Sequence, residues 1–114
     1  MVQIYKIAPR MLWDEAVAQG VFRGAPVDLA DGFIHFSDAA QARETAAKHF
    51  AGQTDLVLIA FDDKSLGPKL IWEPSRGGVL FPHLYDVLPV TKAVWVRDLP
   101  LGDDGVHIFP DLDQ

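Results

Sequence analysis

The sequence predicts a small single domain of the α+β class. Its 114 residues suit one domain, and 49% hydrophobic against 23% charged side chains can form one core. Apolar residues recur at helical spacing in two segments of the N-terminal half, whereas about five or six short extended segments cover much of the rest. No repeat or linker divides the chain. Residues 1–114 are therefore expected to form one domain, with residues 99–114 as a loosely structured tail.

The chain is predicted to begin with a strand and a helix. Residues 2–7 alternate between apolar and polar side chains and are rich in β-branched residues, which is typical of a strand. Pro9 suits the first turn of a helix, because its fixed φ is already helical and its missing N–H has no helical partner there. Apolar residues at helical spacing follow, and Gly20 is expected to end the helix. Trp13, on the apolar face of this helix, is expected in the core.

A loop, a short strand and a second helix are expected next. Residues 21–31 contain Gly, Pro and Asp residues and are predicted to form a loop with a short extended piece. Residues 32–36 are predicted to form a strand, and Ser37 is expected to cap the following helix through its hydroxyl group. That helix, residues 39–50, is rich in alanine and contains Glu44 and Lys48 at the i,i+4 spacing of an ion pair.

The remainder of the chain is predicted to form mainly strands. Four of them are expected, at residues 56–61, 69–73, 79–85 and 90–96. Residues 56–61 are apolar on both faces, as in a central strand that is covered on both sides. Pro82 lacks an N–H group, so residues 79–85 are expected at a sheet edge or a bulge. A short strand is also expected around residues 106–109.

Charge and composition exclude several classes of function. The net charge of −6 and the scattered Lys and Arg residues argue against binding to nucleic acid, which requires clustered cations. The longest uninterrupted apolar run, Leu56–Phe61, is far shorter than the roughly 18 residues of a membrane-spanning helix, and no signal peptide is recognisable. The protein is therefore expected to be cytoplasmic, without a membrane partner. With no cysteine, disulfides, thiolate metal sites and cysteine nucleophiles are excluded.

The segment Asp31-Gly-Phe-Ile-His-Phe-Ser37 is the first candidate site. A strand here would place Phe33, His35 and Ser37 on one face, because side chains alternate along a strand. An imidazole and a hydroxyl group would then project together where a helix begins, and backbone N–H groups at a helix start favour anions. The alternative is a structural His35 bonded to a nearby carbonyl group and a Ser37 that only caps the helix.

A second candidate cluster consists of Glu73, Phe81, His83 and Tyr85. Glu73 is expected at a strand end beside a proline and a double glycine, where it can face a cleft. The other three would share one face of an extended segment. These groups suit general acid–base chemistry or the binding of an aromatic heterocycle linked to a sugar. The alternative is that His83 and Tyr85 only extend from an edge strand into water.

No metal site is expected. The four histidines are isolated from one another in the sequence, and no H-x-H or H-x-x-x-H pair of the kind that binds zinc occurs. Glycine-rich phosphate-binding motifs and the G-x-S-x-G motif of α/β-hydrolases are likewise missing from the sequence.

Four motifs in order resemble the family called domain of unknown function 952. They are Ile4-Tyr-Lys-Ile7 followed by a helix with a tryptophan, Asp31-Gly-Phe-Ile-His-Phe-Ser37, Trp72-Glu73 and Phe81-Pro-His-Leu-Tyr85. The resemblance extends over nearly the whole chain. It implies a fold similar to that of the ADP-ribosyltransferases, a split, mixed or antiparallel β structure with a cleft for NAD.

The same resemblance implies roles for individual residues. His35, with Ser37 two residues later, resembles the histidine that holds the adenosine ribose in that superfamily. Tyr85 or Phe81 would stack on nicotinamide, and Glu73 would stabilise the positively charged ribose of the transition state. Glu73 precedes the aromatic candidates here, whereas the catalytic glutamate of the toxin-like members comes late in the chain.

Three hypotheses about function follow. The first is an enzyme that cleaves or transfers at a ribose, with NAD as a possible cofactor or substrate, and it requires His35 and Glu73 to converge on one cleft. The second is a binding module that keeps the cleft without turnover. The third is a small protein-interaction domain without a ligand, which would be favoured by full burial of His35 and His83. The expected partner is a small molecule, such as a nucleotide; the sequence leaves the oligomeric state open.

Overall fold

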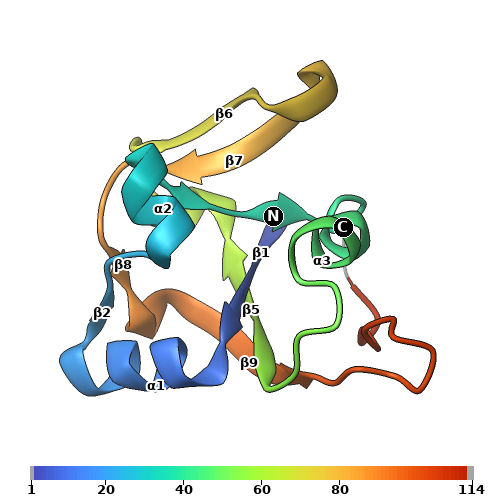
Figure 1. Ribbon diagram of the computed structural model, residues 1–114. Coiled ribbons are helices and arrows are strands. Elements are labelled where there is room, and N and C mark those ends of the chain that lie inside the picture. Colours follow the sequence, from blue (N-terminus) through green and yellow to red (C-terminus); the bar gives the residue numbers. More distant parts are fainter. Residues whose placement is uncertain (1, 113–114) are drawn as a thin grey trace.

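The chain folds into three antiparallel sheets with helices packed around them, as the computed structural model shows (Figure 1). The structure describes residues 2–112, apart from the side chain of Arg76. The helices are α1 (Arg10–Gln19), α2 (Pro26–Asp31) and α3 (Ala42–His49). The strands are β1 (Gln3–Pro9), β2 (Val21–Phe22), β3 (Ile34–His35), β4 (Ser37–Asp38), β5 (Leu56–Asp62), β6 (Leu70–Pro74), β7 (Leu80–Leu84), β8 (Leu88–Pro89) and β9 (Ala93–Leu99). The predicted α+β class is confirmed.

The largest sheet has the strand order β4-β1-β5-β9 and forms the centre of the core. β1 and β5 pair along their full lengths, from Gln3 opposite Asp62 to Pro9 opposite Leu56. Both strands are buried on both faces, as predicted for residues 56–61. Alternate residues therefore enter two separate apolar clusters, because neighbouring side chains on a strand point to opposite faces.

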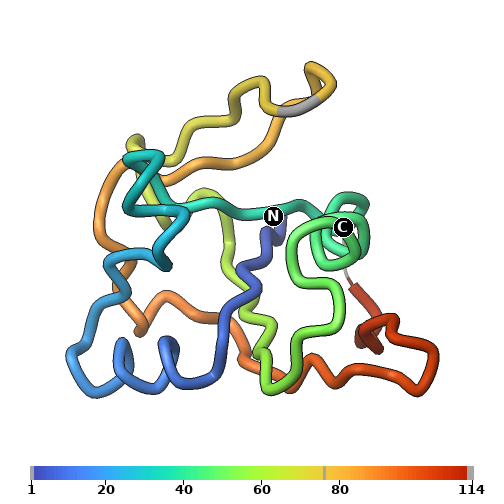
Figure 2. Tube along the Cα trace, in the orientation of Figure 1, coloured from blue at the N-terminus to red at the C-terminus, as the bar shows by residue number. Residues whose placement is uncertain are grey.

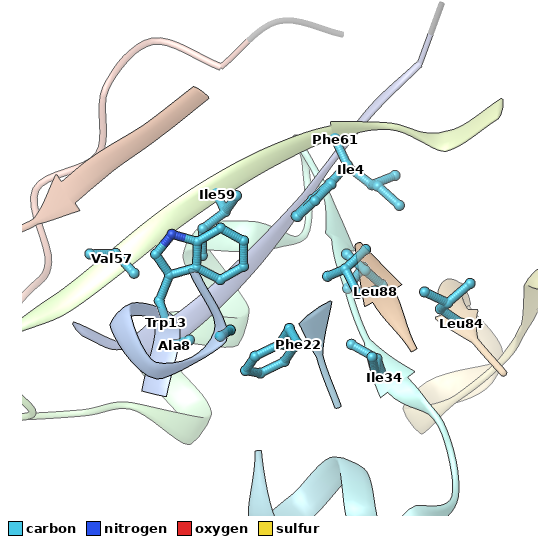
Figure 3. Close-up of a cluster of buried hydrophobic side chains, with 12 residues drawn as sticks. Ile4, Ala8, Trp13, Phe22, Ile34, Val57, Ile59, Phe61, Leu84 and Leu88 are labelled. Carbon is cyan, nitrogen blue, oxygen red and sulfur yellow. The ribbon is translucent and has the colours of Figure 1, made fainter. Parts of the chain in front are cut away.

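One apolar cluster lies between this sheet and α1 (Figure 3). Trp13 is only 4% exposed, and its ring centroid lies 6.1 Å from that of Phe22 and 6.4 Å from that of Phe61. The helix ends at Gly20, whose φ of 87° is left-handed. The predicted helix and the core position of Trp13 are confirmed.

The opposite face of the large sheet packs against α3 and the C-terminal tail. Ala46 of α3 enters the cluster around Tyr5 and Leu58, and Phe109 packs against the same cluster. Figure 2 shows the tail returning beside α3, where the Arg43 guanidinium group lies 5.2 Å from the ring centroid of Phe109. The predicted pair Glu44–Lys48 is present at 2.6 Å.

Two sequence expectations between residues 21 and 41 are wrong. Residues 26–31, expected as loop, form α2, because Pro26 occupies the first helical position and the Asp28 carboxylate accepts the Ala25 N–H. Ser37 does not cap a helix. It belongs to β4, opposite Tyr5 of β1, and its hydroxyl group lies 2.8 Å from that of Thr45.

The C-terminal half also differs in detail from the expected strands. β7 is the middle strand of the sheet β3-β7-β6 and pairs with β6 in a continuous register, so the expectation of a sheet edge or a bulge is wrong. Pro82 is accommodated because β3 ends before it, and the Pro82 carbonyl group accepts the N–H of Phe36 at 3.0 Å. β9 begins at Ala93, after a 3₁₀ turn at Val90–Lys92. Within the described tail, an isolated bridge between Leu101 and His107 stands in place of the strand expected at 106–109.

The short sheet β3-β7-β6 positions the candidate site. Its β6–β7 hairpin extends away from the rest of the fold (Figure 1). The other short sheet pairs β2, which precedes α2, with β8, which follows β7. No helix in the described part of the chain is long and apolar enough to cross a membrane.

Candidate functional site

The sheet β3-β7-β6 brings most of the predicted site residues together. His35 of β3 lies directly opposite His83 of β7, and Glu73 of β6 lies opposite Phe81. The ring centroids of His35 and His83 are 5.5 Å apart. His83 contacts both His35 and Glu73 and so connects them, whereas the enzyme hypothesis requires the two to converge on one cleft.

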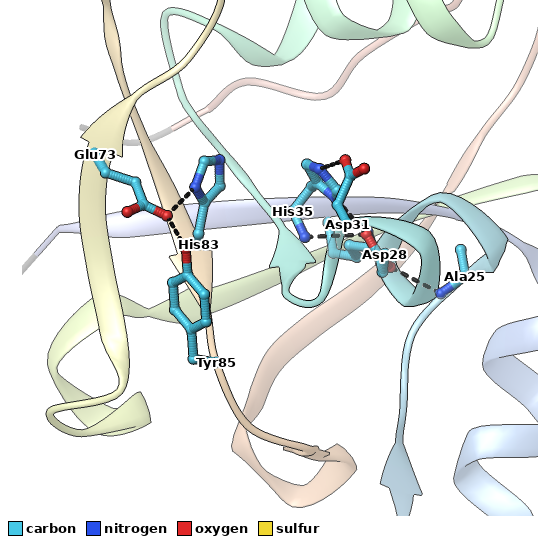
Figure 4. A network of polar contacts seen from close by, with 8 residues as sticks. Ala25, Asp28, Asp31, His35, Glu73, His83 and Tyr85 are labelled. Carbon is cyan, nitrogen blue, oxygen red and sulfur yellow. Dashed lines mark hydrogen bonds and ion pairs between the residues drawn. The ribbon is translucent and has the colours of Figure 1, made fainter.

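Glu73, His83 and Tyr85 form one hydrogen-bonded group (Figure 4). His83 Nδ1 lies 2.7 Å from Glu73 Oε1, and the Tyr85 hydroxyl group donates to the same oxygen. The hydrogen bonds from Tyr85 and then His83 lower the pKa of Glu73, while the bond to Glu73 raises the pKa of Tyr85. Glu73 is therefore an ionised carboxylate at neutral pH, and its Oε2 atom has no hydrogen bond to a described residue.

His35 is held between two carboxylates. Its Nδ1 atom lies 2.6 Å from Asp28 Oδ1, and its Nε2 atom lies 2.9 Å from Asp31 Oδ2. Ionised carboxylates only accept hydrogen bonds, so this geometry is satisfied when both ring nitrogens carry protons. Asp28 is buried, whereas the Asp31 side chain is 48% exposed. A ligand that bonds to His35 Nε2 must therefore replace Asp31.

A buried ion pair between Lys6 and Asp28 fixes the carboxylate that contacts His35. Lys6 Nζ lies 2.9 and 3.0 Å from the two carboxylate oxygens of Asp28. Asp28 also accepts the N–H groups of Ala25 and His35, at 2.7 and 3.1 Å. Burial alone would raise the pKa of Asp28, but the hydrogen bond from His35 and the charge of Lys6 outweigh it and lower that pKa to about 2. Burial lowers the pKa of Lys6, and the charge of Asp28 opposes this effect.

Phe33 packs over the polar cluster. Its ring centroid lies 4.1 Å from that of His83, 4.6 Å from that of His35 and 5.2 Å from that of Tyr85. The ring of Phe33 therefore excludes water from one side of both imidazoles. We refer to Phe33, His35, Glu73, His83 and Tyr85 together as the His–Glu cluster.

An open cavity of about 370 Å³ borders the His–Glu cluster. Phe33 and Tyr85 belong to both, whereas His35, His83 and Glu73 do not line the cavity. Arg23, Asp28 and Asp86 are the charged residues that line it. The cavity and the cluster are thus neighbouring parts of one surface that share two aromatic side chains.

Two predicted site residues lie outside this arrangement. Ser37 is buried at the edge of the large sheet and bonds to Thr45, so its hydroxyl group does not join His35. Phe81 is half-buried opposite Glu73, without a ring contact to a described member of the cluster. Among residues 2–112, no group of three or more potential metal ligands lies together.

Sequence reasoning missed Lys6 and Asp28 as members of this site, and it gave Asp31 no role although Asp31 begins the first candidate segment. Lys6 lies in a strand that is otherwise largely apolar, and Asp28 follows Pro26 at the third position of a helix. A lysine in an apolar strand and an aspartate in the first turn of a helix can each be recognised in a sequence. The ion pair between them cannot be recognised there, because it depends on how α2 packs against β1.

Comparisons with known proteins identify relatives of the same size. The chain is 56% identical to protein CC0527 from Caulobacter crescentus in its crystal structure, with a TM-score of 0.90 and coverage of 93% of each chain. The solution structure of CC0527 gives 57% identity, a TM-score of 0.84 and coverage of 93% of this chain and 91% of that one. No curated protein matches the chain. Residues 7–96 match the family described as "Protein of unknown function (DUF952)", and the chain therefore belongs to this family.

Proposed function

We propose that the His–Glu cluster and the adjoining cavity bind a nucleotide of the NAD or ADP-ribose type, and that Glu73 supports cleavage or transfer at its ribose. The observation that carries this proposal is the ionised Glu73 carboxylate, fixed by Tyr85 and His83 with one oxygen left for a ligand. The fold that the family resemblance implies, similar to that of the ADP-ribosyltransferases, points to the same class of ligand.

The surface offers a partner for each part of such a ligand. Phe33 and Tyr85 provide aromatic faces for a heterocycle. Glu73 Oε2 can accept a ribose hydroxyl group, and His35 Nε2 can donate to the sugar once Asp31 is displaced. This combination of ring, acceptor and donor fits a nucleoside better than it fits a purely apolar molecule.

Glu73 suits the electrostatics of ribosyl transfer. When the bond between the anomeric carbon and nicotinamide nitrogen breaks, its electron pair leaves with nicotinamide and the ribose becomes positively charged. A carboxylate that is already ionised stabilises this charge without a proton transfer. Attack by water at the anomeric carbon, with loss of one proton, then completes the hydrolysis.

A binding module without turnover is the second candidate. It is favoured because polar groups of the cluster are already bonded within the protein: both nitrogens of His35 and one oxygen of Glu73 have partners. The two imidazoles differ in burial: His83 is 4% exposed, whereas the side chain of His35 is 31% exposed. A domain without a ligand would be favoured by full burial of both imidazoles, and only His83 is buried.

A thermal-shift titration with NAD, ADP-ribose, AMP and nicotinamide tests the proposal. Ligand at 100 times its Kd stabilises the fold by about 2.7 kcal/mol, which is several degrees for a domain of this size. Nicotinamide release from NAD is measured in parallel. We expect Glu73→Gln to abolish release while binding remains, and the matched control Glu44→Gln, on the exposed face of α3, to change neither. Stabilisation without release identifies the binding module, and no shift with any of the four compounds refutes both candidates.

A further inference from the structure

Arg23 lies at the wall of the cavity, which also includes two rings of the His–Glu cluster. It follows β2 directly, and it lines the cavity together with Phe33 and Tyr85. The volume of about 370 Å³ is near the lower end of the range of about 300–1,000 Å³ for ligand pockets, so the cavity suits a ligand of modest size. A heterocycle against the rings would thus share this cavity with the Arg23 side chain.

The acidic groups around this surface are already engaged. Asp28 is paired with Lys6, and Asp31 with His35. Glu73, which does not line the cavity, accepts hydrogen bonds from Tyr85 and His83 at Oε1. Asp86, which lines the cavity, accepts the N–H of Val87 at 2.8 Å, and its other oxygen lies 3.9 Å from Lys69 Nζ.

Arg23 itself has no such partner. Within residues 2–112 no hydrogen bond or ion pair engages its guanidinium group, and the side chain is exposed. Other arginines are engaged elsewhere: Arg10 bonds to Asp55 and Asp98, and Arg97 lies over the ring of Trp95 at 4.7 Å. The cavity therefore combines paired carboxylates with one unpaired cation, which favours an anionic ligand despite the acidic net charge.

The backbone around Arg23 is held on both sides. Before it, Phe22 pairs with Leu88 in the β2-β8 sheet. After it, Gly24 has a φ of 127°, and a Cβ atom there would lie 2.9 Å from the Cβ of Asp28. The next residue, Ala25, donates its N–H to Asp28 at 2.7 Å. Asp28 therefore fixes both the loop that carries Arg23 and the imidazole of His35.

We infer that Arg23 binds a phosphate group, and that the ligand of this surface is a nucleotide whose phosphate lies in the cavity rather than an uncharged nucleoside. The guanidinium group presents paired N–H donors that match phosphate oxygens, which makes arginine well suited to this role. This inference rests on the proposed function and adds the group that determines which ligands bind.

Affinities for matched ligand pairs test this inference. Adenosine is compared with AMP, and nicotinamide riboside with nicotinamide mononucleotide, by isothermal titration calorimetry, with inorganic phosphate as a separate ligand. We expect the wild type to bind the phosphorylated member of at least one pair about tenfold more tightly, a difference of about 1.4 kcal/mol. Arg23→Gln should remove this preference and leave the affinity for the nucleoside unchanged. Arg23→Lys should restore part of it, because the charge remains without the paired donors.

The control variant is Arg97→Gln, which removes the same charge from the outer strand β9 and should keep the preference. Equal affinity of the wild type for nucleoside and monophosphate refutes the role of Arg23 while the proposed function stands. A preference for the monophosphate that persists in Arg23→Gln also refutes it. Inorganic phosphate that binds as tightly as the nucleotides overturns the nucleotide assignment. If no ligand of either pair binds, the inference fails, and the titration with NAD and ADP-ribose decides separately whether the proposed function stands.

Discussion

Lys6 and Asp28 form an ion pair next to His35 of the His–Glu cluster, with Nζ 2.9 Å from Oδ2 and both side chains almost fully buried. The pair connects β1, in the centre of the large sheet, to α2. Since Asp28 also bonds to His35, the position of the candidate site depends on a charge in the core.

Replacement of Asp28 by Asn should destabilise the protein strongly. The variant leaves the buried Lys6 ammonium group without its counter-charge, and breaking one partner of a buried pair costs about 3–5 kcal/mol. Urea unfolding followed by circular dichroism measures this loss. The double variant Lys6→Met/Asp28→Leu should recover part of it, because both buried charges are then removed. A loss below about 1 kcal/mol in Asp28→Asn would mean that the pair contributes little to folding.

The same carboxylate predicts acid sensitivity of the fold. The pKa of Asp28 is lowered to about 2 in the folded protein, below its ordinary value of 3.8, so the unfolded chain binds more protons between these values. The stabilisation is therefore complete above about pH 4 and is lost as the pH falls through 2. It amounts to roughly 2 kcal/mol. The free energy of unfolding measured from pH 6 to pH 2 should show this decline, and Lys6→Met/Asp28→Leu should show a shallower one.

Replacement of Asp31 by Ala should increase the affinity for a nucleotide. Asp31 occupies the hydrogen bond of His35 Nε2, and its removal makes that donor available to a ligand. The change in stability should stay below about 1 kcal/mol, because exposed ion pairs contribute little. Affinity for ADP-ribose is compared with that of Asp98→Ala, which removes another exposed carboxylate, paired with Arg10. Weaker binding by Asp31→Ala would instead make Asp31 a direct ligand-binding group.

Trp13 should contribute strongly to stability. Its side chain is buried between α1 and the large sheet, so Trp13→Ala should cost about 3–5 kcal/mol. Val17 lies on the same helix with 53% of its surface exposed, and Val17→Ala should change stability by about 0.5 kcal/mol or less. Thermal and urea unfolding of the two variants test the difference. Similar losses of stability in both variants would contradict the placement of Trp13 in the core.

Much of the candidate site was recognisable in the sequence because its chemistry follows strand periodicity. His83 and Tyr85 alternate along one segment, and the structure keeps both beside Glu73. The placement of His35 opposite His83 was not predictable, since it depends on the pairing of two segments far apart in the chain. Pairing between distant segments reflects packing of the whole fold rather than a local pattern.

The wrong secondary-structure predictions also arise from contacts between distant segments. Ser37 has the residue type of a helix cap, but pairing with β1 draws it into a strand, and α3 begins only at Ala42. Pro82 signals a strand edge, yet β7 is central because β3 is short and ends before the proline. The helix α2 is a single short segment whose start signals also occur in turns. In each case tertiary contacts decided between two local structures that the sequence allowed.

The hydrogen bond from the His35 N–H to Asp28 gives this part of the molecule a measurable opening equilibrium. That amide can exchange its proton with solvent only when the carboxylate withdraws, and the carboxylate cannot withdraw without exposing Lys6 in the core. Exchange at His35 should therefore require an opening close in free energy to complete unfolding, whereas amides at the tip of the β6–β7 hairpin should exchange through small local fluctuations. The free energy needed to open the candidate site would then be close to that of the centre of the sheet, although the site lies at the surface.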